Sequence, residues 1–202
     1  MPDDDLDAKR IAQEHQALRE AIADINIAWA LLENNLAILL CRCMGDDQQF
    51  PLASAILFAP TSLEARIAIV EQAFSVAAGR LPIEPEQTKR VLVKWVRFCK
   101  RINDQKGFRN HVAHGMITNI AHGGRQHIRM TPPPADSARF YKPRKGHQGP
   151  PGYTAHEIQQ SVHSVHRMRG QLTQFAILIE HALAGNGAAF EETLQALEQW
   201  GH

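Results

Sequence analysis

The chain lacks several features that would assign it to a class at once. It has 3 cysteines in 202 residues, too few for the disulfide framework of a small secreted protein, and a chain of this length buries roughly 70% of its unfolded surface without such staples. It also lacks the P-loop, the dinucleotide-binding glycine loop, the nucleophile elbow and the zinc-protease helix motif. We therefore expect no cofactor.

Long apolar runs are also scarce. No stretch reaches the roughly 18 to 20 uninterrupted apolar residues of a membrane span, and the N-terminal Asp3-Asp4-Asp5 is the reverse of the basic start of a signal peptide. These features predict a cytoplasmic protein with no membrane partner. The surroundings of the cysteines are helical and mostly apolar, which favours free buried thiols over a metal or redox pair; they are Cys41, Cys43 and Cys99.

Charge is nearly balanced in total but not along the chain. The chain has 22 Lys and Arg residues and 21 Asp and Glu residues. Residues 80–145 contain 15 of the Lys and Arg residues but only 4 of the Asp and Glu residues. The remainder of the chain therefore has 7 Lys and Arg residues and 17 Asp and Glu residues. A basic middle favours a polyanion such as RNA at that surface. A homodimer that pairs the basic middle with an acidic flank would use the same asymmetry.

Apolar residues recur every three or four positions over most of the chain, which predicts an all-α protein. Capping residues, prolines and glycines set the expected ends, among them a capping box at Thr61-Ser62-Leu63-Glu64 and a stop at Gly79. The expected helices cover residues 6–43, 51–58, 63–77, 85–114, 154–183 and about 187–200. We expect a single domain, 1–202, built as a four-helix up-and-down bundle with a short C-terminal tail helix.

The periodicity changes over an insertion of about 116–153, before the last long helix. Residues 116–121 and 126–131, joined around Gly123-Gly124, predict a small β-hairpin. A proline-rich segment follows, in which basic residues interleave with two aromatic rings: Arg139, Phe140, Tyr141, Lys142, Arg144 and Lys145. Packing of the two rings explains this pattern, and so does binding of single-stranded RNA.

The densest chemistry lies in Arg109-Asn110-His111-Val112-Ala113-His114-Gly115, which we name the RNxxAHG motif. On a helix, Phe108 and Val112 share one face and can hold the segment against a core, which turns Asn110 and His114 to the other side. Gly115 is expected to end the helix. His114 would then lie at a helix C-terminus, where the dipole favours a protonated ring.

The motif resembles the signature of the HEPN superfamily of nucleotide-binding helical domains. That signature is an arginine, usually followed by a polar residue, and a histidine after four to six intervening positions; Arg109, Asn110 and His114 match it with four between. The resemblance implies a metal-independent endoribonuclease that acts as a homodimer, as a toxin or defence component, with these three residues as the catalytic set. Met116 departs from the branch regulated by nucleotidylation, which has a tyrosine there.

A basic stripe leads toward the motif. Arg90, Lys94, Arg97 and Arg101 are spaced four, three and four, and Lys106 follows them. We expect Arg97, Arg101 and Lys106 to bind substrate phosphates. A solvated helix face gives the same pattern, so both interpretations stay open. Helix-turn-helix DNA binding is disfavoured because the stripe lies on a long helix rather than a short recognition helix.

Two alternatives to catalysis fit the same residues. In a non-catalytic interaction module that binds RNA, a nucleotide, an antitoxin or another protein, Arg109 would pair with a carboxylate such as Asp104 or Glu33, and His114 would satisfy carbonyls at the helix end. Histidines also raise the question of a metal, at His163 with His166, or at His111, His114, His122 and His127 if the hairpin folds back. The first set has no nearby cysteine or carboxylate to complete a tetrahedron, and the second needs the hairpin to fold back on the motif, so we expect no metal.

Overall fold

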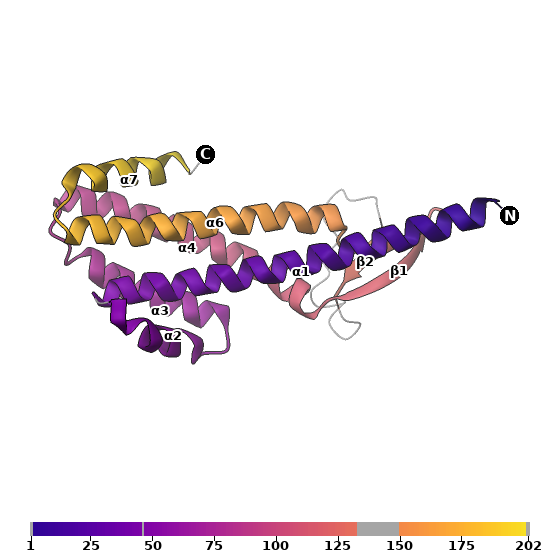
Figure 1. The fold of residues 1–202 in the computed structure, drawn as a ribbon, viewed down its shortest axis with the longest axis horizontal. Helices are drawn as coiled ribbons and strands as arrows, with labels where there is room; N and C mark the ends of the chain where they lie inside the picture. Colours follow the sequence, from indigo (N-terminus) through magenta and orange to yellow (C-terminus); the bar gives the residue numbers. More distant parts are fainter. Residues whose placement is uncertain (1, 46, 133–149, 201–202) are drawn as a thin grey trace. The chain divides into compact units, whose positions relative to one another are not determined.

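The computed structural model describes residues 2–45, 47–132 and 150–200. In these ranges the chain is mostly helical, with a single small antiparallel sheet (Figure 1). The helices are α1 (Pro2–Met44), α2 (Phe50–Phe58), α3 (Leu63–Ala78), α4 (Pro85–His114), α6 (Ala155–Leu183) and α7 (Gly187–Gln199), and the strands are β1 (Met116–His122) and β2 (Arg125–Thr131). The helices, the hairpin and the tail helix that the sequence predicted are confirmed.

Contacts divide the chain into two compact units. Unit 1 comprises Met1–Trp29 and Gly107–Val165, and unit 2 comprises Ala30–Lys106 and His166–His202. The helices α1, α4 and α6 each contribute residues to both units. The RNxxAHG motif belongs to unit 1, whereas the basic stripe belongs to unit 2.

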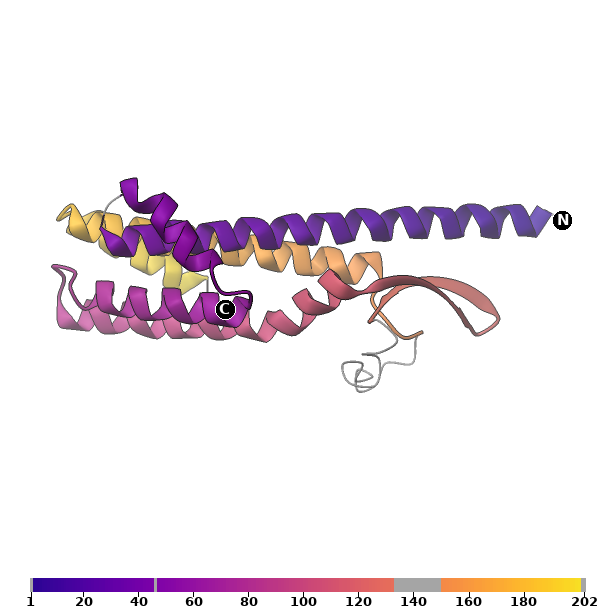
Figure 2. The same cartoon turned by 90° about the horizontal axis from the view of Figure 1, so that it is seen from below.

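The core of unit 2 contains a cluster of buried aromatic rings. Phe74 of α3 stacks on Trp95 of α4 with ring centroids 4.4 Å apart, and Phe175 of α6 meets Trp95 edge-on at 5.1 Å. Such pairs add about 0.5–1.5 kcal/mol each beyond the area they bury. The cluster explains why α3 and the first part of α4 run side by side (Figure 2).

The start of α3 differs in detail from the expected capping box. Ser62 is the N-cap, and its Oγ accepts a hydrogen bond from the backbone N–H of Ala65 at 3.1 Å. Glu64 lies in the first turn and forms an ion pair with Lys106 at 2.7 Å instead of turning back to a Thr61 cap. The helix start was therefore predicted correctly, but the reciprocal capping box was wrong. Gly79 is the C-cap, as expected.

In unit 1 the hairpin packs against the first part of α1 (Figure 1). Gly123 and Gly124 have φ of 59° and 76°, the two left-handed positions of a type I′ turn. Glu14 of α1 accepts a hydrogen bond from the N–H of Ile128 at 3.3 Å, and Arg10 donates one to the carbonyl of Gln126 at 3.2 Å. These bonds link α1 to β2.

The same edge of β2, opposite β1, also meets a residue just before the start of α6. Met130 and Tyr153 exchange two backbone hydrogen bonds of 3.0 and 2.9 Å. One residue later, Thr154 and Glu157 form a reciprocal capping box, because Thr154 Oγ1 accepts from the N–H of Glu157 and the Glu157 carboxylate accepts from the N–H of Thr154. The box fixes the start of α6 locally, and the sequence predicted this start at Thr154 but not the box.

The long helix α1 also bears on location. Its segment Leu6–Met44 is long and apolar enough to cross a membrane, with a mean hydropathy of 1.4 in the most apolar stretch. Half of that stretch is buried inside the protein, and a core helix of a soluble protein passes the same test. The length and hydropathy of α1 are therefore weak evidence in either direction, and the cytoplasmic location stays a prediction.

Two sequence interpretations concern other parts of the chain. The basic and aromatic residues between 139 and 145 lie outside the described residues. The three cysteines are free thiols; Cys41 and Cys99 are buried and Cys43 is half-buried. The expectation of free thiols is confirmed.

Candidate functional site

The RNxxAHG motif forms the end of α4, and its two faces are as expected. Val112 is buried, and the ring of Phe108 packs edge-to-face on Tyr153 with centroids 5.0 Å apart. Asn110 and His114 are exposed. The apolar pair therefore holds the helix end in the core of unit 1 and leaves one amide and one imidazole at the surface.

Gly115 is needed at its position for space. A Cβ there would lie 2.6 Å from the carbonyl oxygen of His111, 2.9 Å from Met130 Cγ and 3.2 Å from the carbonyl oxygen of Thr131. Its φ is not left-handed. The chain thus passes from α4 into β1 so closely against β2 that no side chain fits, and this close approach sets where His114 lies relative to the hairpin.

Arg109 lies beside Asn110 in the same turn. It is half-buried, and its Nη1 is 3.5 Å from Asn110 Oδ1, at the outer limit of a hydrogen bond. The ring of His111 lies 6.2 Å from that of Tyr153. The site in one chain consists of one guanidinium, one amide and one exposed imidazole, that of His114, the last residue of α4.

The carboxylates near the stripe have partners of their own. Glu33, one of the two partners considered for Arg109, forms an ion pair with Arg66 of α3. Lys106, expected to bind substrate, is joined to Glu64, and this hydrogen bond lowers the pKa of the Glu64 carboxyl. Because the Lys106 pair is exposed, it is worth little energy and can exchange for a stronger anion.

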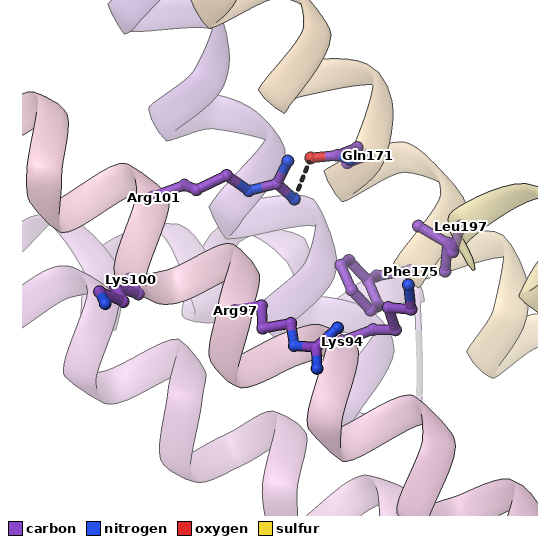
Figure 3. A pocket seen from close by; sticks show the side chains of 7 residues that line it. All are labelled: Lys94, Arg97, Lys100, Arg101, Gln171, Phe175 and Leu197. Atoms are coloured by element: carbon purple, nitrogen blue, oxygen red, sulfur yellow. Dashed lines mark hydrogen bonds between the residues drawn. The ribbon is translucent and has the colours of Figure 1, made fainter. Parts of the chain in front are cut away.

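The basic stripe borders a pocket in unit 2, which we name the basic pocket (Figure 3). Its cavity volume is about 230 Å³. It is lined by Lys94, Arg97, Lys100, Arg101, Gln171, Phe175 and Leu197. Two of the predicted substrate-binding residues, Arg97 and Arg101, are thus brought together. The residues from α6 and α7 were missed, because nothing local to α4 indicates which helix will face it.

Arg90, the first residue of the stripe, belongs to a clamp between α4 and α7. Its guanidinium donates to Glu191 at 2.9 Å and to both oxygens of Glu198 at 3.0 and 3.1 Å. These bonds raise the pKa of Arg90 and lower the pKa values of the two carboxyls. The stripe is therefore neither one solvated face nor one continuous binding surface, since its first residue is neutralised by acidic neighbours.

The histidines give no metal centre in the part of the chain that the structure describes. No group of three or more His, Cys, Asp or Glu side chains is close enough there to hold an ion. His122 and His127 approach each other across the hairpin, with ring centroids 6.4 Å apart. Two imidazoles without further ligands do not complete the coordination of a structural zinc.

Comparison with protein-family models, curated proteins and solved structures gives no match to this chain. The RNxxAHG motif and the geometry around it are therefore the basis for a function.

Proposed function

We propose that this protein is a HEPN-like domain that cleaves RNA without a metal, as a toxin or defence component, with four of its helices forming an up-and-down bundle. The observation that carries the proposal is the exposure of His114 and Asn110 at one helix end, next to Arg109. A base or acid, a fixed cation and a polar helper are the groups that cleavage of a ribose phosphate chain requires.

The reaction would be an internal transfer. His114 as base takes the proton from a ribose 2′-OH, the 2′ oxygen attacks phosphorus, and the bond to the 5′ oxygen breaks. An acid protonates that leaving oxygen, so the products are a 2′,3′-cyclic phosphate and a 5′-OH. Arg109 would hold the charge on the phosphorane oxygens through its planar fork, and Asn110 would orient the phosphate.

Acid–base catalysis of this kind needs two proton-transfer groups. One chain supplies one exposed imidazole in the motif, so we propose a homodimer in which two motifs face each other across a twofold axis. Each proton-transfer group contributes about 10² to 10⁴ in rate. A monomer should therefore be a poor enzyme, and specific activity should fall when the protein is diluted below the dissociation constant of the dimer.

The test is cleavage of a defined single-stranded RNA in excess EDTA, with the ends of the products identified by mass spectrometry. We expect a cyclic phosphate product, no cleavage of DNA, and a loss of about 100-fold or more for His114→Ala. The matched control is His163→Ala, which removes another exposed histidine of unit 1. Cleavage that survives His114→Ala, or that EDTA abolishes, would contradict the proposal.

A second candidate is a non-catalytic binding module. It is favoured by the packing roles of Val112 and Gly115, which show that part of the motif serves the fold. Here Arg109 would be structural. The two candidates differ in the effect of Arg109→Ala on the melting temperature: a fall of several degrees with no RNA cleavage in the wild type favours the module, whereas an active-site arginine costs little stability when removed.

A further inference from the structure

The basic pocket carries more positive charge than its surroundings neutralise. Four cationic side chains line it, and no carboxylate does. Acidic side chains act nearer the two ends of the stripe: Arg90 is bound by Glu191 and Glu198, Lys94 contributes to the lowered pKa of the Glu198 carboxyl, and Lys106 is paired with Glu64. Like charges gathered at a partly enclosed cavity repel one another unless an anion separates them. The pocket is therefore electrostatically prepared for an anionic ligand.

Two of the cations are held in place by the protein. Gln171, which is only 4% exposed, accepts a hydrogen bond from Arg101 Nη2 at 2.8 Å and donates from its Nε2 to the carbonyl of Trp200 at 3.4 Å. Lys94 donates to the carbonyl oxygen of Glu198 at 3.2 Å. A buried amide fixed at both ends thus positions the Arg101 guanidinium, which reduces the ordering cost when a ligand binds.

The other two cations are open to a ligand. Arg97 and Lys100 are exposed, and neither makes a side-chain hydrogen bond or ion pair to any residue in the described ranges. Figure 3 shows Lys94, Arg97 and Arg101 extending from α4 toward α6, with Lys100 further from Gln171. Partial burial lowers the pKa of Arg101, a sign that its charge has lost part of its water without gaining a carboxylate.

We propose that the basic pocket binds a small ligand through a diphosphate group. Two linked phosphates present oxygens in several directions. This arrangement suits the three cations that extend toward α6, which are Lys94, Arg97 and Arg101, better than the single phosphorus centre of orthophosphate does. The cavity of about 230 Å³ is smaller than the roughly 300–1,000 Å³ of sites that enclose a whole organic ligand. Phe175 and Leu197, at 1% and 3% exposed, offer little apolar surface. Recognition is therefore of the anion.

The experiment is isothermal titration of the full chain with sodium pyrophosphate, and with orthophosphate at matched ionic strength, without divalent metals. We expect pyrophosphate to bind more tightly than orthophosphate. Arg97→Ala should weaken pyrophosphate binding about tenfold or more, because it removes a charge-assisted contact. The matched control is Arg80→Ala, which removes an exposed arginine of the same unit outside the pocket and should leave the affinity within twofold.

Gln171→Glu separates binding from folding. The glutamate keeps the shape of the side chain and can still accept the bond from Arg101, but it adds a negative charge to the pocket. We expect it to reduce pyrophosphate affinity at least as much as Arg97→Ala does while the protein stays folded by circular dichroism. Equal loss in Arg80→Ala would show diffuse attraction and overturn the proposal, as would the absence of pyrophosphate binding at millimolar concentration.

The RNxxAHG motif is a second place where an anion can bind, so Arg109→Ala is titrated as well. If Arg109→Ala weakens pyrophosphate binding and Arg97→Ala does not, the ligand is at the motif and the proposal for the basic pocket is overturned. RNA binding that depends on Arg97 in a protein that does not bind pyrophosphate would also overturn it, in favour of a surface for the RNA chain. RNA cleavage is read out separately, so either proposal can fail while the other holds.

Discussion

The close approach at Gly115 gives the sharpest prediction, because Gly107, a glycine inside α4, provides the control. Gly115→Ala would place a methyl carbon 2.6 Å from the carbonyl oxygen of His111 and 2.9 Å from Met130 Cγ. Met130 can move, but the carbonyl belongs to the helix backbone. Gly107→Ala, inside α4, would place its methyl where none of the neighbouring atoms that count as contacts lies within 4 Å.

The two substitutions should change stability in opposite directions. Overpacking costs about 1–3 kcal/mol, and the contact with a backbone carbonyl puts Gly115→Ala in the upper part of that range. Alanine also makes the unfolded chain less flexible, which offsets part of this cost. The net loss in the free energy of unfolding should be about 2 kcal/mol. Gly107→Ala should stabilise by about 0.5–1 kcal/mol, since alanine replaces glycine inside a helix. At about 2–4 °C per kcal/mol for a chain of this size, Gly115→Ala should lower the melting temperature by roughly 4–8 °C.

Differential scanning calorimetry of the two variants and the wild type measures these shifts. Hydrogen exchange adds a local readout, because relief of the clash must move either the end of α4 or the hairpin and so weaken protection of the β2 amides. A Gly115→Ala protein that melts at or above the wild-type temperature would refute the reasoning. A similar fall in Gly107→Ala would refute it as well, since the loss would then follow from replacing a glycine in this part of the chain and not from the close contact at Gly115.

Two further predictions concern charge and thiols. Arg90 lowers the pKa values of Glu191 and Glu198 below the usual 4.5, so the clamp contributes stability above pH 4.5 and loses it as the pH falls through the lowered pKa values. The melting temperature of Arg90→Gln should therefore drop less steeply on acidification than that of the wild type. Equal slopes would show that the clamp contributes nothing to stability. Burial raises the pKa values of the Cys43 and Cys99 thiols to about 12. Near neutral pH, both thiols should therefore react with Ellman's reagent far more slowly in the native protein than in denaturant. An immediate reaction in the native protein would show that the thiols are accessible.

The helices were readable from the sequence because their signals are local. A 3-4 apolar spacing, Thr154 three residues before Glu157, and Pro85 at the start of α4 act within one or two turns, and the structure places helix ends accordingly. The hairpin was readable for the same reason, since Gly123 and Gly124 supply the two left-handed residues that a tight turn requires. The error at α3 was also local: Thr61 and Ser62 are both good caps, and the sequence alone does not choose between them.

In the RNxxAHG motif, too, only the features set by neighbouring residues could be predicted from the sequence. Its helical spacing was enough to predict that Val112 is buried and that Asn110 and His114 are exposed. The role of Gly115 was not readable, because the atoms that exclude a side chain there include Met130 and Thr131, which the hairpin brings back from 15 and 16 residues further along the chain.

The sequence by itself determined the helical class, the turn of the hairpin and the outward face of the RNxxAHG motif, since neighbours within a few residues set backbone conformation and side-chain direction. Only the tertiary structure decided what became of the basic stripe. Arg90 meets Glu198 from 108 residues away and Arg101 meets Gln171 from 70 residues away. A charge repeated along one helix is neutralised, buried or left open to a ligand according to which distant segment packs against it, and spacing along α4 contains no information about that segment.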